Sequence, residues 1–257
     1  MVVVRDSYII LSMTFLIMLP RAISEFLFRR TSFRMVWVFR VIDVFDIILQ
    51  TISYFALAIY IFVRCIPRDG YREHLICMVL TSLLIGGHMM HFAANALDMH
   101  YKEVLYVDTE NAMPESAYTL LHFLDEYLSH IILFTSMILL MTLGVISEIG
   151  RENGARNLDL LDRILIIFSS LILGVALGLT AVESSIPVYM IVLSVANLGV
   201  IIWFYRERAR DSISKYPFSL YVVILLTLIV VSDAVYCMLF GTTSPRDLIV
   251  GGVMGGA

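Results

Sequence analysis

The chain has 257 residues, of which 60% are hydrophobic and only 16% charged, and its formal net charge is −4. Soluble domains are roughly half apolar and a quarter charged, so this composition, with a mean hydropathy of +0.87, places the chain in a membrane. The small negative charge and scattered basic residues argue against nucleic-acid binding, and Cys65, Cys77 and Cys237 are too few and too separated for a disulfide framework or a thiolate zinc site.

Seven segments are candidates for membrane spans, because a span needs about 20 mainly apolar residues to cross the hydrocarbon. The first, at 8–28, is the weakest, since Pro20 and Arg21 interrupt it; an uncleaved, signal-like anchor is the alternative. Six clearer spans follow it at 41–64, 75–97, 117–145, 160–182, 186–205 and 218–240. The sequence therefore predicts an all-α, polytopic seven-transmembrane helix bundle with one domain, 1–257.

The distribution of arginine and lysine predicts the orientation in the membrane, because cytoplasmic loops are enriched in both. The second, fourth and sixth loops hold the larger set, namely Arg64, Arg68, Arg72, Arg151, Arg156, Arg163, Arg206, Arg208, Arg210 and Lys215. The other loops hold Arg29, Arg30, Arg34, Arg40 and Lys102. We therefore expect an integral protein of the cell membrane with a cytoplasmic N-terminus and an extracytoplasmic third loop.

Ionisable residues form one stripe on the third span and another on the fourth. His88, His91, Asn95 and Asp98 are spaced by three, four and three residues, so they share one face of a helix. The same spacing relates His122, Asp125, Glu126 and His130 in the fourth span.

The two stripes lie at matching depth. His91 precedes Asp98 by seven residues and Asp125 follows Ala117 by eight, so both lie roughly 10–12 Å from the third loop at about 1.5 Å per residue. Glu183 and Asp233 lie towards the same side of the membrane and are expected to support the cluster, whereas the opposite halves of the spans carry no ionisable residue. The sequence predicts a functional half and a dry half.

Imidazoles beside carboxylates suit a metal ion. An ionised carboxylate in hydrocarbon costs at least ~2.5 kcal/mol, so such residues are retained where they pair, bind an ion or transfer protons. Zinc is the expected metal, with manganese, iron or copper as alternatives. The expected ligands are His88, His91, His122 and His130, and Asp125 or Glu126 is the expected general base. A hydrogen-bonded structural network is the alternative interpretation.

The segments HFAANAL and LLHFLDEYLSHIILF, on seven predicted spans, resemble the alkaline ceramidase and adiponectin-receptor superfamily of seven-span metal hydrolases. The resemblance covers two of the seven helices. It implies that His91 matches that family's ligand histidine and Asp125 its aspartate. Two positions depart from the pattern: Gly87 stands where the family has serine, and the last span lacks the His-x-x-x-His that completes the family's zinc site.

Three function classes fit these observations. The first is a metal-dependent, hydrolase-like enzyme that acts on a membrane lipid or apolar substrate. The second is a metal-ion or proton transporter, against which the dry half argues, because transport needs polar groups that reach both faces. The third is a non-catalytic, metal-binding or assembly subunit of a membrane complex. An opsin is excluded because Lys102 and Lys215 both lie outside the spans.

Overall fold

A computed structural model describes residues 5–27, 34–36, 39–105, 115–151, 154–209 and 211–242, without the side chains of 20–27, 34–36, 39–46, 98–105, 115–116 and 118. The described part is almost entirely helical. Its helices are α1 (Asp6–Leu27), α2 (Val41–Tyr60), η1 (Ile61–Cys65), α3 (Tyr71–Leu105), α4 (Glu115–His122), η3 (Phe123–Ser129), α5 (His130–Gly150), α6 (Leu160–Glu183), α7 (Pro187–Arg208), η4 (Ile213–Lys215) and α8 (Pro217–Phe240). A short antiparallel pair, β1 (Arg34–Val36) and β2 (Phe39–Arg40), precedes α2.

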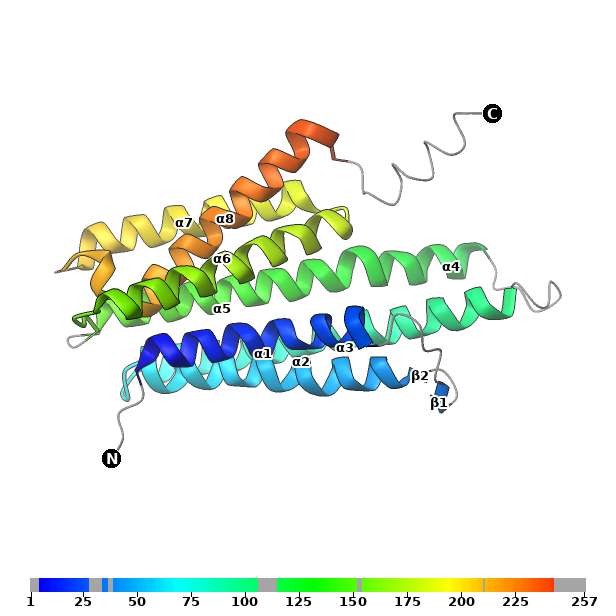
Figure 1. Cartoon of the computed structure of the whole chain (residues 1–257), viewed down its shortest axis with the longest axis horizontal. Coiled ribbons are helices and arrows are strands. Elements are labelled where there is room, and N and C mark those ends of the chain that lie inside the picture. Colours follow the sequence, from blue (N-terminus) through cyan, green and yellow to red (C-terminus); the bar gives the residue numbers. More distant parts are fainter. Residues whose placement is uncertain are drawn as a thin grey trace.

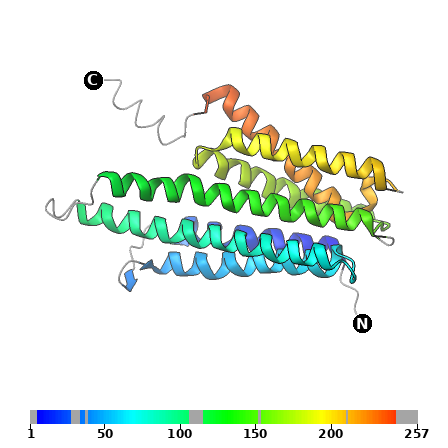
Figure 2. The ribbon, with the colours of Figure 1, turned by 180° about the vertical axis from the view of Figure 1, so that it is seen from behind.

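The long helices lie side by side as an elongated bundle (Figure 1). Helices α1, α2 and α3 form one side, α6, α7 and α8 form the other, and α5 lies between them (Figures 1 and 2). The start of α1 and the α2–α3, α5–α6 and α7–α8 connections gather at one end, which we call the α5–α6 end. The opposite end, where α3 and α4 project beyond the other helices, is the α3–α4 end.

Six helical segments in the described residues are long and apolar enough to cross a membrane, which makes this an integral membrane protein by composition and length. They are Ile47–Cys65, Tyr71–Leu97, Thr119–Gly150, Leu160–Glu183, Pro187–Arg208 and Pro217–Phe240. Their positions agree with six of the predicted spans. The first predicted span forms one continuous helix past Pro20, but its apolar part is shorter, at Asp6–Leu19.

Two helical regions differ from the α-helical spans that the sequence predicts. Helix α3 has 35 residues and continues to Leu105, into the predicted third loop. The fourth span contains η3, a π-helical segment of seven residues, between α4 and α5. A π-helix has more residues per turn than an α-helix, so the side chains on either side of η3 do not keep the three-and-four spacing that the sequence predicts.

Glycine permits a close helix contact between α6 and α8. A Cβ at Gly174 would lie 2.9 Å from Leu228 Cβ and 3.0 Å from the carbonyl oxygen of Leu225, and one at Gly178 would lie 2.1 Å from Ser232 Oγ. Two glycines four residues apart let helix backbones approach in a membrane, where van der Waals packing drives association. Close van der Waals packing therefore contributes to the contact between α6 and α8, in addition to any polar contacts.

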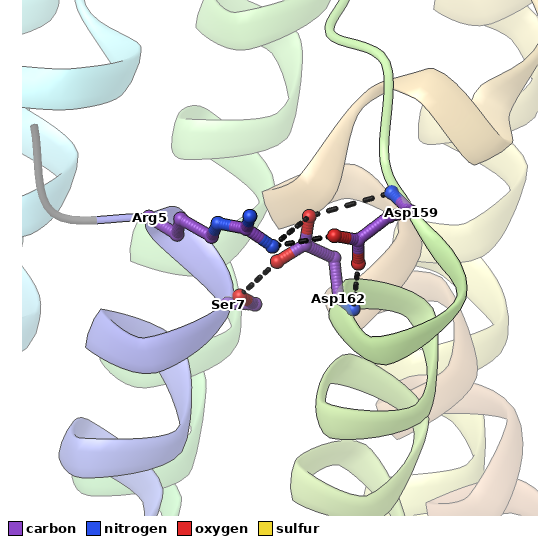
Figure 3. Close-up of polar contacts among 4 residues, drawn as sticks. All are labelled: Arg5, Ser7, Asp159 and Asp162. Atoms are coloured by element: carbon purple, nitrogen blue, oxygen red, sulfur yellow. Dashed lines mark hydrogen bonds and ion pairs between the residues drawn. The ribbon is translucent and has the colours of Figure 1, made fainter.

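A polar network joins α1 to the start of α6 at the α5–α6 end (Figure 3). Arg5 Nη1 lies 2.5 Å from Asp159 Oδ2 and 3.6 Å from Asp162 Oδ2, and the Ser7 hydroxyl donates to Asp162 Oδ1 at 2.5 Å. Asp159 is the N-cap of α6 and accepts from the Asp162 amide at 2.8 Å. This amide, and then the Arg5 guanidinium, hold the pKa of the Asp159 carboxyl below its ordinary value.

Asp6, the first residue of α1, lies between Arg5 and Ser7 in the chain and is buried. It pairs with Arg156 of the α5–α6 connection, and Arg64 Nε of η1 lies 3.9 Å from its Oδ1. Its negative charge also suits the N-terminus of a helix. The start of α1 is thereby fixed beside the α2–α3 and α5–α6 connections.

A buried glutamate lies at the same end, in the part of the span Thr119–Gly150 that continues beyond the predicted boundary at residue 145. Glu148, in the last turn of α5, is 5% exposed. Its carboxylate accepts from the Phe218 amide at 3.1 Å and from the amide and hydroxyl of Ser219, each at 2.7 Å. These amides open α8, where the backbone has no intrahelical acceptor. Glu148 therefore caps α8 from a different helix.

Candidate functional site

The site is built around the π-helical segment η3. Asp125 in this segment contacts one histidine through its carboxylate and another through its backbone carbonyl. Asp125 lies in η3 and is 5% exposed. Its carboxylate meets His91 of α3, and its backbone carbonyl meets His130 at the start of α5. Short π-helical segments inside α-helices occur frequently at functional sites, because they free carbonyl groups and turn side chains away from the α-helical spacing.

His91 and Asp125 form the central pair. The Nδ1 atom of His91 lies 2.7 Å from Asp125 Oδ1 and 3.4 Å from the Asp125 carbonyl oxygen. The carbonyl oxygen is the hydrogen-bond acceptor, and the carboxylate lies within ion-pair distance, so both contacts favour a proton on Nδ1. Asp125 thereby fixes the tautomer and orientation of the His91 ring, and the Nε2 atom of the neutral imidazole keeps a lone pair.

His130 is held by the same carbonyl group. Its Nδ1 atom lies 2.9 Å from the Asp125 carbonyl oxygen, which can only accept, so Nδ1 donates and Nε2 again keeps its lone pair. The His91 and His130 ring centroids are 4.4 Å apart at 64°. Ser129 donates to the same oxygen at 2.5 Å. Sequence spacing did not single out Ser129, which lies four residues after Asp125, whereas His130 reaches the same carbonyl over five residues.

Gly87 brings α3 close enough for these contacts. A Cβ at this position would lie 3.0 Å from the backbone nitrogen of Leu133 and 3.0 Å from Ile132 Cγ2, both in α5. The close approach is one turn of α3 away from His91 and one turn of α5 away from His130. A side chain at position 87 would therefore crowd α5, which would have to shift by a few tenths of an ångström.

The other two predicted ligand histidines lie in different surroundings. His88 is buried, but its ring packs edge-on against Tyr54 of α2, with 5.5 Å between the centroids. His122, at the end of α4, is exposed. Glu126 is half-buried and lies beside Asp125 in η3. Contacts of His91 and His130 with Asp125, and with each other, join the two predicted stripes.

The four residues expected to support the site are distributed over the bundle. Asn95 is half-buried on α3, one turn beyond His91, and Glu183 is exposed at the end of α6. Asp98 lies in α3, but its side chain is outside the described residues. Asp233 is fully buried on α8, where a Cβ at Gly178 of α6 would lie 2.9 Å from its Oδ1. It therefore belongs to the α6–α8 contact and not to the α3–η3 contact.

The described part of the chain does not complete a zinc site. No group of three or more histidine, cysteine, aspartate or glutamate side chains converges there with the geometry of metal ligands. A catalytic zinc takes about three protein ligands, whereas the cluster offers two Nε2 atoms and a carboxylate already paired with His91. What the arrangement does provide is an oriented imidazole base next to a buried carboxylate.

The three residues of the cluster differ in how far their side chains are exposed. The His91 side chain is 31% exposed, whereas Asp125 and His130 are buried. His91 lies 20 residues from the start of α3, or about 30 Å along the helix at 1.5 Å per residue, which is close to the full thickness of the hydrocarbon. The apolar span Tyr71–Leu97 ends six residues after His91, so the cluster lies in the half of this span towards the α3–α4 end.

Comparison with known proteins adds no relative from which a role can be transferred, since no protein-family model, curated protein or solved structure matches this chain.

Proposed function

We propose that the protein is a membrane-embedded, hydrolase-like enzyme in which His91 is the general base and Asp125 positions it. The observation that carries the proposal is the 2.7 Å contact between His91 Nδ1 and the buried Asp125 carboxylate. A carboxylate on Nδ1 leaves Nε2 to take a proton from water or a substrate hydroxyl, and it stabilises the imidazolium that results. A partly exposed base backed by a buried acid is the arrangement that this chemistry needs.

A lipid or another apolar molecule is the proposed substrate. The partly exposed His91 lies on a helix whose outer face is apolar, with Met89 and Leu97 exposed on either side of it in sequence. A substrate dissolved in the bilayer reaches such a position laterally. Its polar head then lies at the depth of the cluster, near the boundary between hydrocarbon and headgroups.

Seven spans remain the proposed topology, with α1 as the additional one. Its 22 residues correspond to about 33 Å at 1.5 Å per residue, which is enough to cross the hydrocarbon. The pairing of Asp6 with Arg156 supports an N-terminus on the same side as the α5–α6 connection. The arginine count makes that side cytoplasmic, so the cluster would face the extracytoplasmic leaflet of the cell membrane.

A metal centre is the second candidate function. Both histidines have Nδ1 occupied by an acceptor, which is the usual support of an imidazole that binds a metal through Nε2. A third ligand would have to come from outside the described side chains, for example Asp98. A metal centre is compatible with the proposed relation to the alkaline ceramidase and adiponectin-receptor superfamily, although a serine at position 87 would crowd α5.

The test uses the full chain reconstituted in liposomes with fluorogenic lipid amides and esters. We expect turnover by the wild type and a 10²–10⁴-fold loss in His91→Gln and Asp125→Asn, as for a lost general base. Glu207→Gln is the matched control, because this exposed carboxylate lies in the last turn of α7, at the opposite end of the bundle. Equal turnover in Asp125→Asn and wild type would contradict the proposal.

Elemental analysis of the same preparations separates the two candidates. About one transition metal per chain, lost in His91→Ala and His130→Ala, would favour the metal centre. Turnover by protein that contains no metal would favour the imidazole base acting alone.

A further inference from the structure

A polar cavity lies at the α5–α6 end, away from the histidine cluster. It has a volume of about 240 Å³ and is lined by residues from the ends of α5 and α7 and from the connection to α8, among them Ile149, Arg151, Phe204, Arg208, Asp211 and Tyr216. This volume is far above the ~10–15 Å³ that one water needs. The cavity is therefore large enough for a polar group of several atoms.

The charges in the cavity leave an excess of positive charge. Lys215 Nζ lies 2.5 Å from Asp211 Oδ1, so the one acidic side chain that lines the cavity is already paired. Arg151 donates one hydrogen bond, from Nη1 to the Arg64 carbonyl oxygen at 2.8 Å, which leaves its other donors available. Arg208 is exposed and makes no hydrogen bond or ion pair with any described residue.

The position of the cavity matches the level of lipid headgroups. Two spans, Thr119–Gly150 and Pro187–Arg208, end at its rim. Ile149 and Phe204 give it apolar walls, and the neighbouring Trp203 is 63% exposed on the outer face of α7. A phosphate in the cavity would thus have its acyl chains beside an apolar helix face. Basic pockets between spans are known to bind anionic headgroups.

We propose that this cavity binds a phosphate oxyanion, and that its source is the headgroup of an anionic phospholipid in the adjoining leaflet. Guanidinium groups match the geometry of phosphate oxygens and bind them with paired hydrogen bonds. The competing explanation is that Arg151 and Arg208 only offset the negative ends of α5 and α7, which both stop here. The experiment below separates the two.

The test is native mass spectrometry of the purified full chain with phosphatidic acid, phosphatidylcholine or inorganic phosphate. We expect retention of phosphatidic acid over phosphatidylcholine, and at least tenfold weaker binding in Arg208→Gln. Arg163→Gln is the matched control, because it removes the same charge from an exposed residue of α6 outside the cavity. It should bind as the wild type does.

Three outcomes would overturn the proposal or its lipid source. Wild-type affinity in Arg208→Gln would leave the arginines with the role of offsetting helix ends. Equal weakening in Arg208→Gln and Arg163→Gln would reduce the effect to general surface charge. Competition by inorganic phosphate as effective as that by phosphatidic acid would keep the oxyanion site and reject the lipid as its source. Because Arg208 bonds no described residue, its substitution is not expected to affect folding.

Discussion

Among single residues, Glu148 illustrates how one buried carboxylate determines where a helix begins. It supplies acceptors to two amides and a hydroxyl at the start of α8. We expect Glu148→Ala to lower the free energy of unfolding by about 2–4 kcal/mol, since each buried donor left without an acceptor costs about 1–3 kcal/mol and the losses are not additive. Thermal unfolding in detergent measures this.

The neighbouring Ser147 provides the control for that measurement. Its hydroxyl is buried and has no hydrogen-bond partner within the described structure, so Ser147→Ala removes no contact of this kind. We expect Ser147→Ala to unfold within about 0.5 kcal/mol of the wild type. A Glu148→Ala variant as stable as Ser147→Ala would show that water replaces the carboxylate at the start of α8.

Between helices, stability depends on small residues at the α6–α8 contact. Gly174 faces Leu228 Cβ and the backbone of Leu225, which cannot rotate away. We expect Gly174→Ala to destabilise the bundle by about 1–3 kcal/mol, the usual cost of overpacking. Gly199→Ala is the matched control, because a Cβ at Gly199 of α7 meets nothing within 4 Å. That change should stabilise α7 by about 0.5–1 kcal/mol through helix propensity. Equal effects of the two changes would mean that α6 and α8 separate readily.

At the scale of the whole molecule, the attachment of α1 depends on pH through Asp159. Its pKa is lowered in the folded state, chiefly by the Asp162 amide and then by Arg5. The carboxylate therefore stabilises the fold above the unfolded-state pKa near 4, and this contribution is lost as the pH falls through the folded-state pKa. We expect the melting temperature of Asp159→Asn to fall less between pH 7 and pH 3 than that of the wild type.

The same comparison has an internal control. Asn remains a good N-cap, so Asp159→Asn removes the charge while keeping the start of α6. Asp69→Asn changes an exposed carboxylate in the α2–α3 turn, at the same end of the bundle. It should retain the acid sensitivity of the wild type. An unchanged acid sensitivity in Asp159→Asn would show that the Arg5 contact does not hold α1 in place.

The sequence by itself determined that the chain is a helical membrane protein and where six of its spans lie. A segment of about 20 apolar residues satisfies its backbone hydrogen bonds in lipid by forming an α-helix. Composition and length are therefore enough to identify the spans. It also predicted that the His91 and Asp125 stripes lie at one depth, since depth follows from counting residues along straight helices.

Only the tertiary structure decided which members of those stripes meet. The α-helical spacing treats His88, His91, His122 and His130 alike, but η3 changes the spacing locally and Gly87 sets the approach of α3 to α5. Neither effect follows from periodicity. The acceptor that starts α8 likewise comes from Glu148, 69 residues before Pro217 in the chain. Contacts between segments so far apart depend on how the helices pack, which no local pattern contains.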